Sequence, residues 1–207
     1  YDLSEAQVGS AQVGFSPNGR HLVVTEKATN RIVTFPVQWN GRLGASTVSS
    51  SAGQTPFGFA FSNRGDLIVS EAFGGAPGAS VLSSYGFERA GGVDDISALV
   101  ATTQTAACWV AVTPNGRYAF STNTGSGSVS LFHVAHTGVI ELADATAAQT
   151  DGTAPIDMAL SDGGRFLYVL ESATPSMQGY RVGHDGSLEP VGERVSLPAG
   201  VNGLAAR

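Results

Sequence analysis

The sequence predicts an all-β fold, a β-propeller of four-stranded antiparallel blades. Three observations support this prediction: a motif that recurs four times, a second strand after each copy, and a constant spacing between an aromatic residue and a glycine. Gly accounts for 27 of the 207 residues and charged residues for only 14%, a composition that favours short strands and tight turns over helices.

The recurring motif is a strand of alternating apolar and polar residues that ends at a turn. Each copy reaches a Ser or Thr followed by Pro-Asn-Gly or a related turn, in which the Gly can take a positive φ. The Ser or Thr lies at Ser16, Ser62, Thr113 and Ser161. A repeat of about 48 residues with period-two alternation is typical of propeller blades, whereas helical repeats of similar length do not alternate in this way.

The rest of each repeat supplies three more strands. A second strand follows the turn, and a third carries an aromatic residue six positions before a turn glycine, in the pairs Phe35–Gly41, Tyr85–Gly91, Phe132–Gly138 and Tyr180–Gly186. A short fourth strand leads to the next copy. We therefore expect one propeller domain with blades at about 11–52, 56–102, 107–149 and 154–197, and with 199–207 as a closing strand.

The ends of such a stack expose unpaired strand edges and apolar blade faces. The chain therefore belongs to a larger ring, forms a small closed ring or associates with itself. Because it begins at Tyr1 without a Met, we favour the C-terminal part of a larger ring.

Composition also limits the partners and the compartment. The net charge is −6 and Lys27 is the single lysine, so there is no basic face for nucleic acid or for an anionic membrane. No run approaches the ~18 apolar residues that span a bilayer. We expect a soluble protein with a small-molecule partner, in the cytoplasm rather than secreted after removal of a leader. Cys108 is alone, so no disulfide forms within the chain.

At the level of motifs, the sequence resembles the lactonase family of seven-bladed β-propellers. This family includes the propeller-type 6-phosphogluconolactonases and the fungal 3-carboxy-cis,cis-muconate cyclases. The resemblance is carried by residues 15–20, 112–118, 122–130 and 184–188. It covers essentially the whole chain but only the last four or five of the family's seven blades, so the N-terminal blades are expected to be missing.

The resemblance implies a bacterial-type hydrolase that opens or forms the lactone ring of a sugar acid or a related small carboxylate. One departure matters. Family members often carry a histidine five residues before the anchor serine, and the matching positions here are Ala11, Phe57, Cys108 and Ile156. None of these side chains shuttles a proton in the ordinary way. A non-catalytic propeller that binds a protein or a small ligand is therefore the alternative.

Propeller geometry brings the end of each second strand to the start of the inner strand, around the central channel. The second strands end at Glu26, Glu71, Asn123 and Glu171, which are our candidate catalytic residues. Carboxylates gathered in a partly dewatered channel raise one another's pKa, so one can act as general base on the attacking water. Asn123 can stabilise the oxyanion. The competing interpretation is that these polar residues cap the turn into the third strand.

The candidate substrate-binding residues lie on the same face. Lys27 follows Glu26 and supplies a cation, while Phe57 and Trp109 offer a stacking surface for a ring-shaped ligand or else pack in the core. Gln12 and Asp157 complete this set at the starts of the inner strands.

No cofactor and no metal ligands are expected. The Glu, Asn and Asp side chains do form an all-oxygen set that suits Ca²⁺, so a lactonase that depends on a divalent cation is a further alternative. The four histidines show no ligand spacing.

Overall fold

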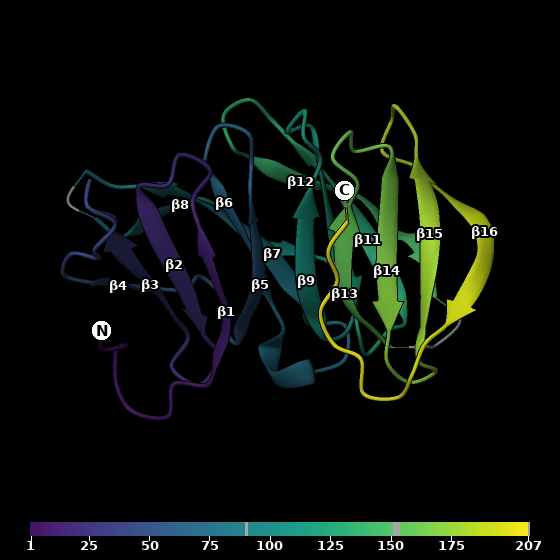
Figure 1. The fold of residues 1–207 in the computed structure, drawn as a ribbon, viewed down its shortest axis with the longest axis horizontal. Helices are drawn as coiled ribbons and strands as arrows, with labels where there is room; N and C mark the ends of the chain where they lie inside the picture. Colours follow the sequence, from purple (N-terminus) through teal and green to yellow (C-terminus); the bar gives the residue numbers. More distant parts are fainter. Residues whose placement is uncertain (90, 151–153, 207) are drawn as a thin grey trace.

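The computed structural model describes residues 1–89, 91–150 and 154–206. Within these ranges sixteen strands form four antiparallel sheets, and each sheet takes four strands that are consecutive in the chain (Figure 1). The predicted all-β propeller architecture of four blades is therefore confirmed.

The blades follow one another along the chain, each with its strands in sequence order. Blade 1 contains β1 (Ser10–Phe15), β2 (His21–Glu26), β3 (Arg31–Pro36) and β4 (Thr47–Ser50). Blade 2 contains β5 (Pro56–Phe61), β6 (Leu67–Glu71), the short 3-10 turn η1 (Phe73–Gly75), β7 (Val81–Phe87) and β8 (Val93–Ala101). Blade 3 contains β9 (Ala107–Val112), β10 (Tyr118–Asn123), β11 (Ser128–Val134) and β12 (Ile140–Gln149). Blade 4 contains β13 (Pro155–Leu160), β14 (Phe166–Glu171), β15 (Ser176–Val182) and β16 (Leu188–Ser196).

Apolar residues seal the contacts between neighbouring blades. On β6, Leu67 and Val69 join a cluster shared with blade 1, whereas Ile68 between them joins a cluster shared with blade 3. Successive side chains of a strand point to opposite faces, so one strand can bury both faces of its sheet. A third cluster joins blades 3 and 4, with Phe120 and Leu167 among its fully buried members. The inner strands β5, β9 and β13 consequently lie side by side.

The start of each inner strand is irregular in the same way. The residue seven positions before the anchor Ser or Thr has a left-handed backbone, with φ of +59° at Gly9, +58° at Thr55, +55° at Ala106 and +55° at Ala154. The pairing register of the inner two strands shifts just beyond this residue, as at a β-bulge. A bulge turns side chains out of the alternating pattern and is often found beside functional sites.

The C-terminal residues lie against blade 4. The backbone N–H of Leu204 donates to Asp157 Oδ2 at 2.7 Å, and residues 204–206 line a shallow pocket together with Tyr168 and Met177. No strand is assigned between residues 197 and 206, so the closing strand expected at 199–207 stays a prediction, and Arg207 lies outside the described residues. Within the described ranges there is also no helix long and apolar enough to cross a membrane.

Candidate functional site

The ends of the second strands meet the starts of the inner strands, as the sequence predicts. The facing pairs are Ser10 with Glu26, Pro56 with Glu71, Ala107 with Asn123, and Pro155 with Glu171. All four predicted catalytic side chains have an exposed fraction of 0%. Their chemistry is therefore decided by the groups buried with them.

Glu71 is fully occupied by hydroxyl donors. The hydroxyls of Ser51 and Tyr85 each donate to Glu71 Oε1 at 2.6 Å, and Ser83 Oγ donates to Oε2 at 2.7 Å. Burial, followed by the charge of Glu71, raises the pKa of Tyr85, so this phenol stays protonated and remains a donor.

Glu26 has a similar set of donors. Its Oε1 accepts the backbone N–H of Ser4 at 3.0 Å, and its Oε2 accepts the hydroxyls of Ser4 and of Thr29, the latter at 2.6 Å. Burial alone would raise the pKa of Glu26, but these hydrogen bonds and the charge of Arg31 outweigh it and lower the pKa. The carboxylate is therefore a weak base, better suited to holding donors than to taking a proton.

The other two positions are less completely occupied. Asn123 Nδ2 donates to Ser128 Oγ at 3.1 Å and to Ser130 Oγ at 2.8 Å. Glu171 Oε2 accepts the hydroxyl of Ser176 at 2.7 Å and forms an ion pair with Arg194 Nε at 3.0 Å. Asn123 Oδ1 and Glu171 Oε1 are buried, and neither has a hydrogen-bond partner in the part of the chain that the structure describes.

These four residues therefore bond within their own blades and to the linkers before them. No hydrogen bond or ion pair joins one of them to another among the described residues, nor do those residues contain a group of three or more His, Cys, Asp or Glu side chains placed to hold a metal ion. The catalytic roles of Glu26, Glu71, Glu171 and Asn123 stay predictions, and the hydrogen bonds to third-strand residues agree with the capping interpretation.

Three of the predicted substrate-binding residues do come together. Lys27 Nζ lies 4.9 Å from the centroid of the Phe57 ring, and that ring packs edge-on against Trp109 with 5.8 Å between centroids. All three side chains are partly exposed. A cation beside two accessible aromatic rings can hold a ring-shaped ligand that carries negative charge.

Cys108 lies next to this group. Burial raises the pKa of its thiol, while a hydrogen bond with Thr124 and the charge of Lys27 act in the opposite direction. Cys108 and Phe57 occupy equivalent positions in their blades, because each lies five residues before the anchor Ser or Thr of its blade. The thiol is therefore a neutral part of the wall rather than a ready nucleophile.

Gln12 and Asp157, the remaining predicted substrate-binding residues, form hydrogen bonds with backbone groups. Gln12 Oε1 accepts from the N–H of Phe59 at 2.7 Å, and its Nε2 donates to the carbonyl of Phe59 at 3.0 Å. Asp157 accepts the N–H groups of Met158 and Leu204, both at 2.7 Å. Gln12 thus connects the inner strands of blades 1 and 2, and Asp157 connects its strand to the C-terminal residues. Substrate binding by the two side chains stays a prediction.

Replacing Asp157 with asparagine should change the stability relative to the wild type in a pH-dependent way, with the balance shifting toward the variant as the pH rises. Burial raises the pKa of Asp157 above its ordinary value, although the two N–H donors partly oppose this. The native state then binds more protons than the unfolded state between the ordinary and the raised pKa, so wild-type stability falls as pH rises through this window and stays reduced above it. Asparagine carries no charge, and it keeps one of the two acceptor oxygens, so the lost hydrogen bond is a cost that does not depend on pH. The difference in Tm between variant and wild type should therefore grow as pH rises from about 3 to 7.

Asp162→Asn, in an exposed turn, is the matched control and should show no such trend. A difference in Tm for Asp157→Asn that does not change with pH would contradict the prediction.

Two features of this region were not predicted from the sequence. The repeated bulge could not be predicted because it is a feature of the backbone. It is recognised in the structure by the left-handed residue that lies seven positions before each anchor. Arg194 was missed because it lies on a fourth strand, outside the motif.

Comparison with known proteins shows that the chain matches the model of one protein family. Residues 2–72 and 83–203 match the model described as lactonase, 7-bladed beta-propeller. No curated protein sequence gives a significant match.

Solved structures share the fold. A protein from Lactobacillus plantarum superposes with a TM-score of 0.76 at 19% identity, over 91% of this chain and 56% of that one. A putative 6-phosphogluconolactonase from Bacteroides fragilis gives 0.73 at 16% identity, over 94% and 58%. A periplasmic gluconolactonase from Pseudomonas aeruginosa gives 0.70 at 20% identity, over 89% and 56%. This chain thus spans a little over half the length of these proteins.

Proposed function

The chain belongs to the lactonase family of seven-bladed β-propellers, and on this premise we propose that it takes part in the hydrolysis of a lactone of a sugar acid or a related small carboxylate. The names of two similar structures, a putative 6-phosphogluconolactonase and a gluconolactonase, support this substrate class. The observation that carries the proposal is the group of Lys27, Phe57 and Trp109 at the starts of the inner strands.

In the proposed step, water adds to the lactone carbonyl carbon. The bond from that carbon to the ring oxygen breaks, and the ring oxygen takes up a proton, which leaves an open hydroxy acid. Phe57 and Trp109 pack against the sugar ring. Lys27 stabilises the negative charge that develops on the carbonyl oxygen or on a carboxylate substituent. A carboxylate at the end of a second strand accepts the proton of the attacking water. This sequence of events needs no cofactor.

Removing the cation or the larger ring should weaken substrate binding. We expect Lys27→Met and Trp109→Ala each to raise KM about tenfold, which corresponds to a loss of ~1.4 kcal/mol of binding free energy. The measurement is the initial rate of hydrolysis of D-glucono-1,5-lactone by the full-length protein, with far-UV circular dichroism to verify the fold. Arg20→Met is the control, because this exposed arginine lies in the turn before β2, at the other end of that strand. An unchanged KM in both variants would remove this group from the site.

The carboxylates are tested separately with Glu71→Gln and Glu171→Gln. Loss of kcat in either variant would support a general base at the end of a second strand, and unchanged rates in both would exclude these two residues from the reaction. Added calcium should change neither the rate nor the Tm, and a calcium-dependent gain in either would favour a cation-dependent lactonase.

A non-catalytic binding propeller is the second candidate. It is favoured by the bulge positions themselves, which hold Ala11, Phe57, Cys108 and Ile156 instead of a proton-transferring residue. Binding of D-gluconate without turnover of any lactone in a panel would establish this alternative.

A further inference from the structure

We propose that Ser70 is a positioning residue of the candidate site, and that its buried hydroxyl sets the separation of the Phe57 and Trp109 rings. The inference rests on the proposed function, because that function assigns the two rings to the substrate. Ser70 lies on β6 and its side chain has an exposed fraction of 0%. It therefore acts on a ligand only through the backbone that carries the two rings.

The side-chain oxygen of Ser70 joins the peptide groups next to the two rings. The N–H of Gly58, which directly follows Phe57, donates to Ser70 Oγ at 3.1 Å. The Ser70 hydroxyl donates to the carbonyl of Cys108, which directly precedes Trp109. The carbonyl oxygen of Gly58 lies farther from the same hydroxyl, at 3.1 Å. The serine thus links the peptide group after Phe57 in blade 2 to the peptide group before Trp109 in blade 3.

The other ends of these two peptide groups are held by the equivalent residues of the neighbouring blades. Thr25 Oγ1 on β2 donates to the carbonyl of Phe57 at 2.6 Å, and Thr122 Oγ1 on β10 accepts the N–H of Trp109 at 3.0 Å. Thr25, Ser70 and Thr122 each lie one residue before the polar residue that ends the second strand. All three side chains are fully buried, so water does not compete for these hydrogen bonds.

The two peptide groups are in close contact because residue 58 is a glycine. A Cβ at Gly58 would lie 2.5 Å from the carbonyl oxygen of Cys108 and 2.8 Å from the Cα of Trp109. Phe57 in turn contacts both Trp109, with 5.8 Å between ring centroids, and Lys27 Nζ, at 4.9 Å from its own centroid. A shift of the peptide group that carries Phe57 therefore changes both contacts, and small errors in position weaken a binding site strongly.

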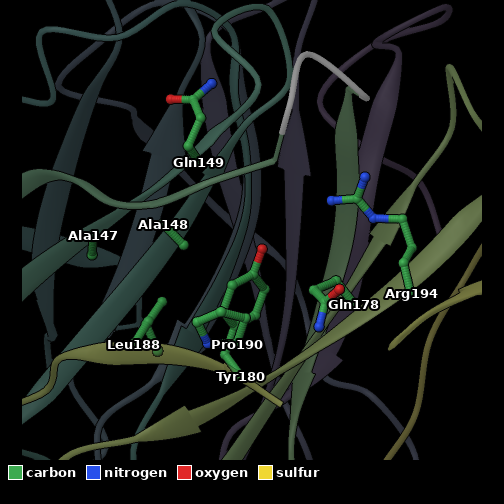
Figure 2. Close-up of a pocket in the computed structure, with 8 residues that line it drawn as sticks. All are labelled: Ala147, Ala148, Gln149, Gln178, Tyr180, Leu188, Pro190 and Arg194. Atoms are coloured by element: carbon green, nitrogen blue, oxygen red, sulfur yellow. The ribbon is translucent and has the colours of Figure 1, made fainter. Parts of the chain in front are cut away.

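Blade 4 shows that a blade forms without this hydroxyl. It has Leu170 at the equivalent position, one residue before Glu171. Figure 2 shows Gln178 and Arg194 at the outer crevice between blades 3 and 4, and their hydrogen bonds stay within blade 4: Gln178 donates to two carbonyls of its own sheet, and Arg194 pairs with Glu171. The three hydroxyls occur in blades 1, 2 and 3, which are the blades that supply Lys27, Phe57 and Trp109.

The test compares Ser70→Ala with Ser84→Ala in the full-length protein. Ser84 is the matched control, because it is also a fully buried serine of blade 2 whose hydroxyl donates to a backbone carbonyl of blade 3, that of Gly138, at 2.8 Å. We expect Ser70→Ala to raise KM for D-glucono-1,5-lactone about fivefold and to change kcat less than about twofold, since the rings contact substrate and transition state alike. Ser84→Ala should change neither constant.

Conservative variants separate the hydroxyl from the space that it fills. Ser70→Thr restores the hydroxyl in the form that blades 1 and 3 carry, so KM should return to within about twofold of the wild type. Thr25→Val keeps the shape of threonine but removes the donor to the carbonyl of Phe57, so it should raise KM as Ser70→Ala does. Thr25→Ser should keep the wild-type KM. If Ser70→Ala does not fold, the two variants of Thr25 decide the question.

A second measurement does not depend on catalysis. The chain has two tryptophans and Trp39 is 97% exposed, so Trp39→Phe leaves Trp109 as the single tryptophan emitter. In this background, Ser70→Ala should shift the emission maximum of Trp109 and increase its quenching by acrylamide about twofold, because the ring is no longer held against Phe57. Ser84→Ala should leave both properties unchanged.

An unchanged KM in folded Ser70→Ala would overturn the proposal, whatever the emission of Trp109. An equal rise of KM in Ser84→Ala would also overturn it, because any lost contact between blades 2 and 3 would then weaken binding. If the wild type hydrolyses no lactone, the proposed function fails, and the emission of Trp109 alone then decides whether Ser70 positions the rings.

Discussion

Replacement of Gly58 by alanine is expected to lower the free energy of unfolding by about 3 kcal/mol, at the upper end of the cost of overpacking a core. A Cβ at this position would lie 2.5 Å from the carbonyl oxygen of Cys108 and 2.8 Å from the Cα of Trp109. Both are backbone atoms, so no rotamer change relieves the contact. The inner strands of blades 2 and 3 would have to separate.

Urea denaturation followed by circular dichroism measures this effect. Gly163→Ala is the matched control, because its nearest contacts, in the side chain of Arg165, are at 3.9 Å and its φ is not positive. Equal unfolding midpoints for Gly58→Ala and wild type would show that the two inner strands can move apart at little cost. Because Trp109 lies at the contact, its fluorescence should change in Gly58→Ala but not in the control.

Replacement of Glu71 by leucine is expected to destabilise the protein by about 3 kcal/mol, because three hydroxyl donors lose their acceptor at a cost of roughly 1 kcal/mol or more each. The hydroxyls of Ser51, Ser83 and Tyr85 would lose the carboxylate that accepts from them, and Ser83 and Tyr85 are fully buried. Unpaired buried donors carry a desolvation cost that the added apolar surface of leucine offsets only in part.

Chemical denaturation of Glu71→Leu beside Glu71→Gln separates the contributions. Glutamine retains an oxygen acceptor and should lose less stability. Glu141→Leu, on the exposed face of β12, is the control and should leave stability nearly unchanged. A loss below about 1 kcal/mol for Glu71→Leu would mean that the three hydroxyls find other acceptors.

The sequence was sufficient for the fold because the signals for a blade are local. The short run of strand-forming residues at 118–122 and the glycine of the preceding turn specify strand and hairpin without reference to distant parts of the chain. In the structure the second strands end at the predicted polar residues, Glu26, Glu71, Asn123 and Glu171.

The candidate site was only partly predictable. The face on which Lys27, Phe57 and Trp109 meet follows from blade topology, and the structure confirms that they come together. The surroundings of Glu71 could not be predicted in the same way, because its partners Ser51 and Tyr85 lie 20 and 14 residues away on a linker and on the third strand. Nor does a sequence motif reveal which blade carries an arginine against its carboxylate.

The left-handed residue at the start of each inner strand lets the neighbouring side chain vary without a change in the backbone hydrogen bonds. In all four blades the carbonyl of this residue accepts the N–H that follows the second strand, at 2.9 to 3.1 Å. These are main-chain bonds, so they do not depend on the neighbouring bulge side chain. That side chain is free to be alanine, phenylalanine, cysteine or isoleucine. Each blade thus has one position at the start of its inner strand where the side chain can vary during evolution. The main-chain hydrogen bonds that hold the strand in place are kept whichever side chain is present.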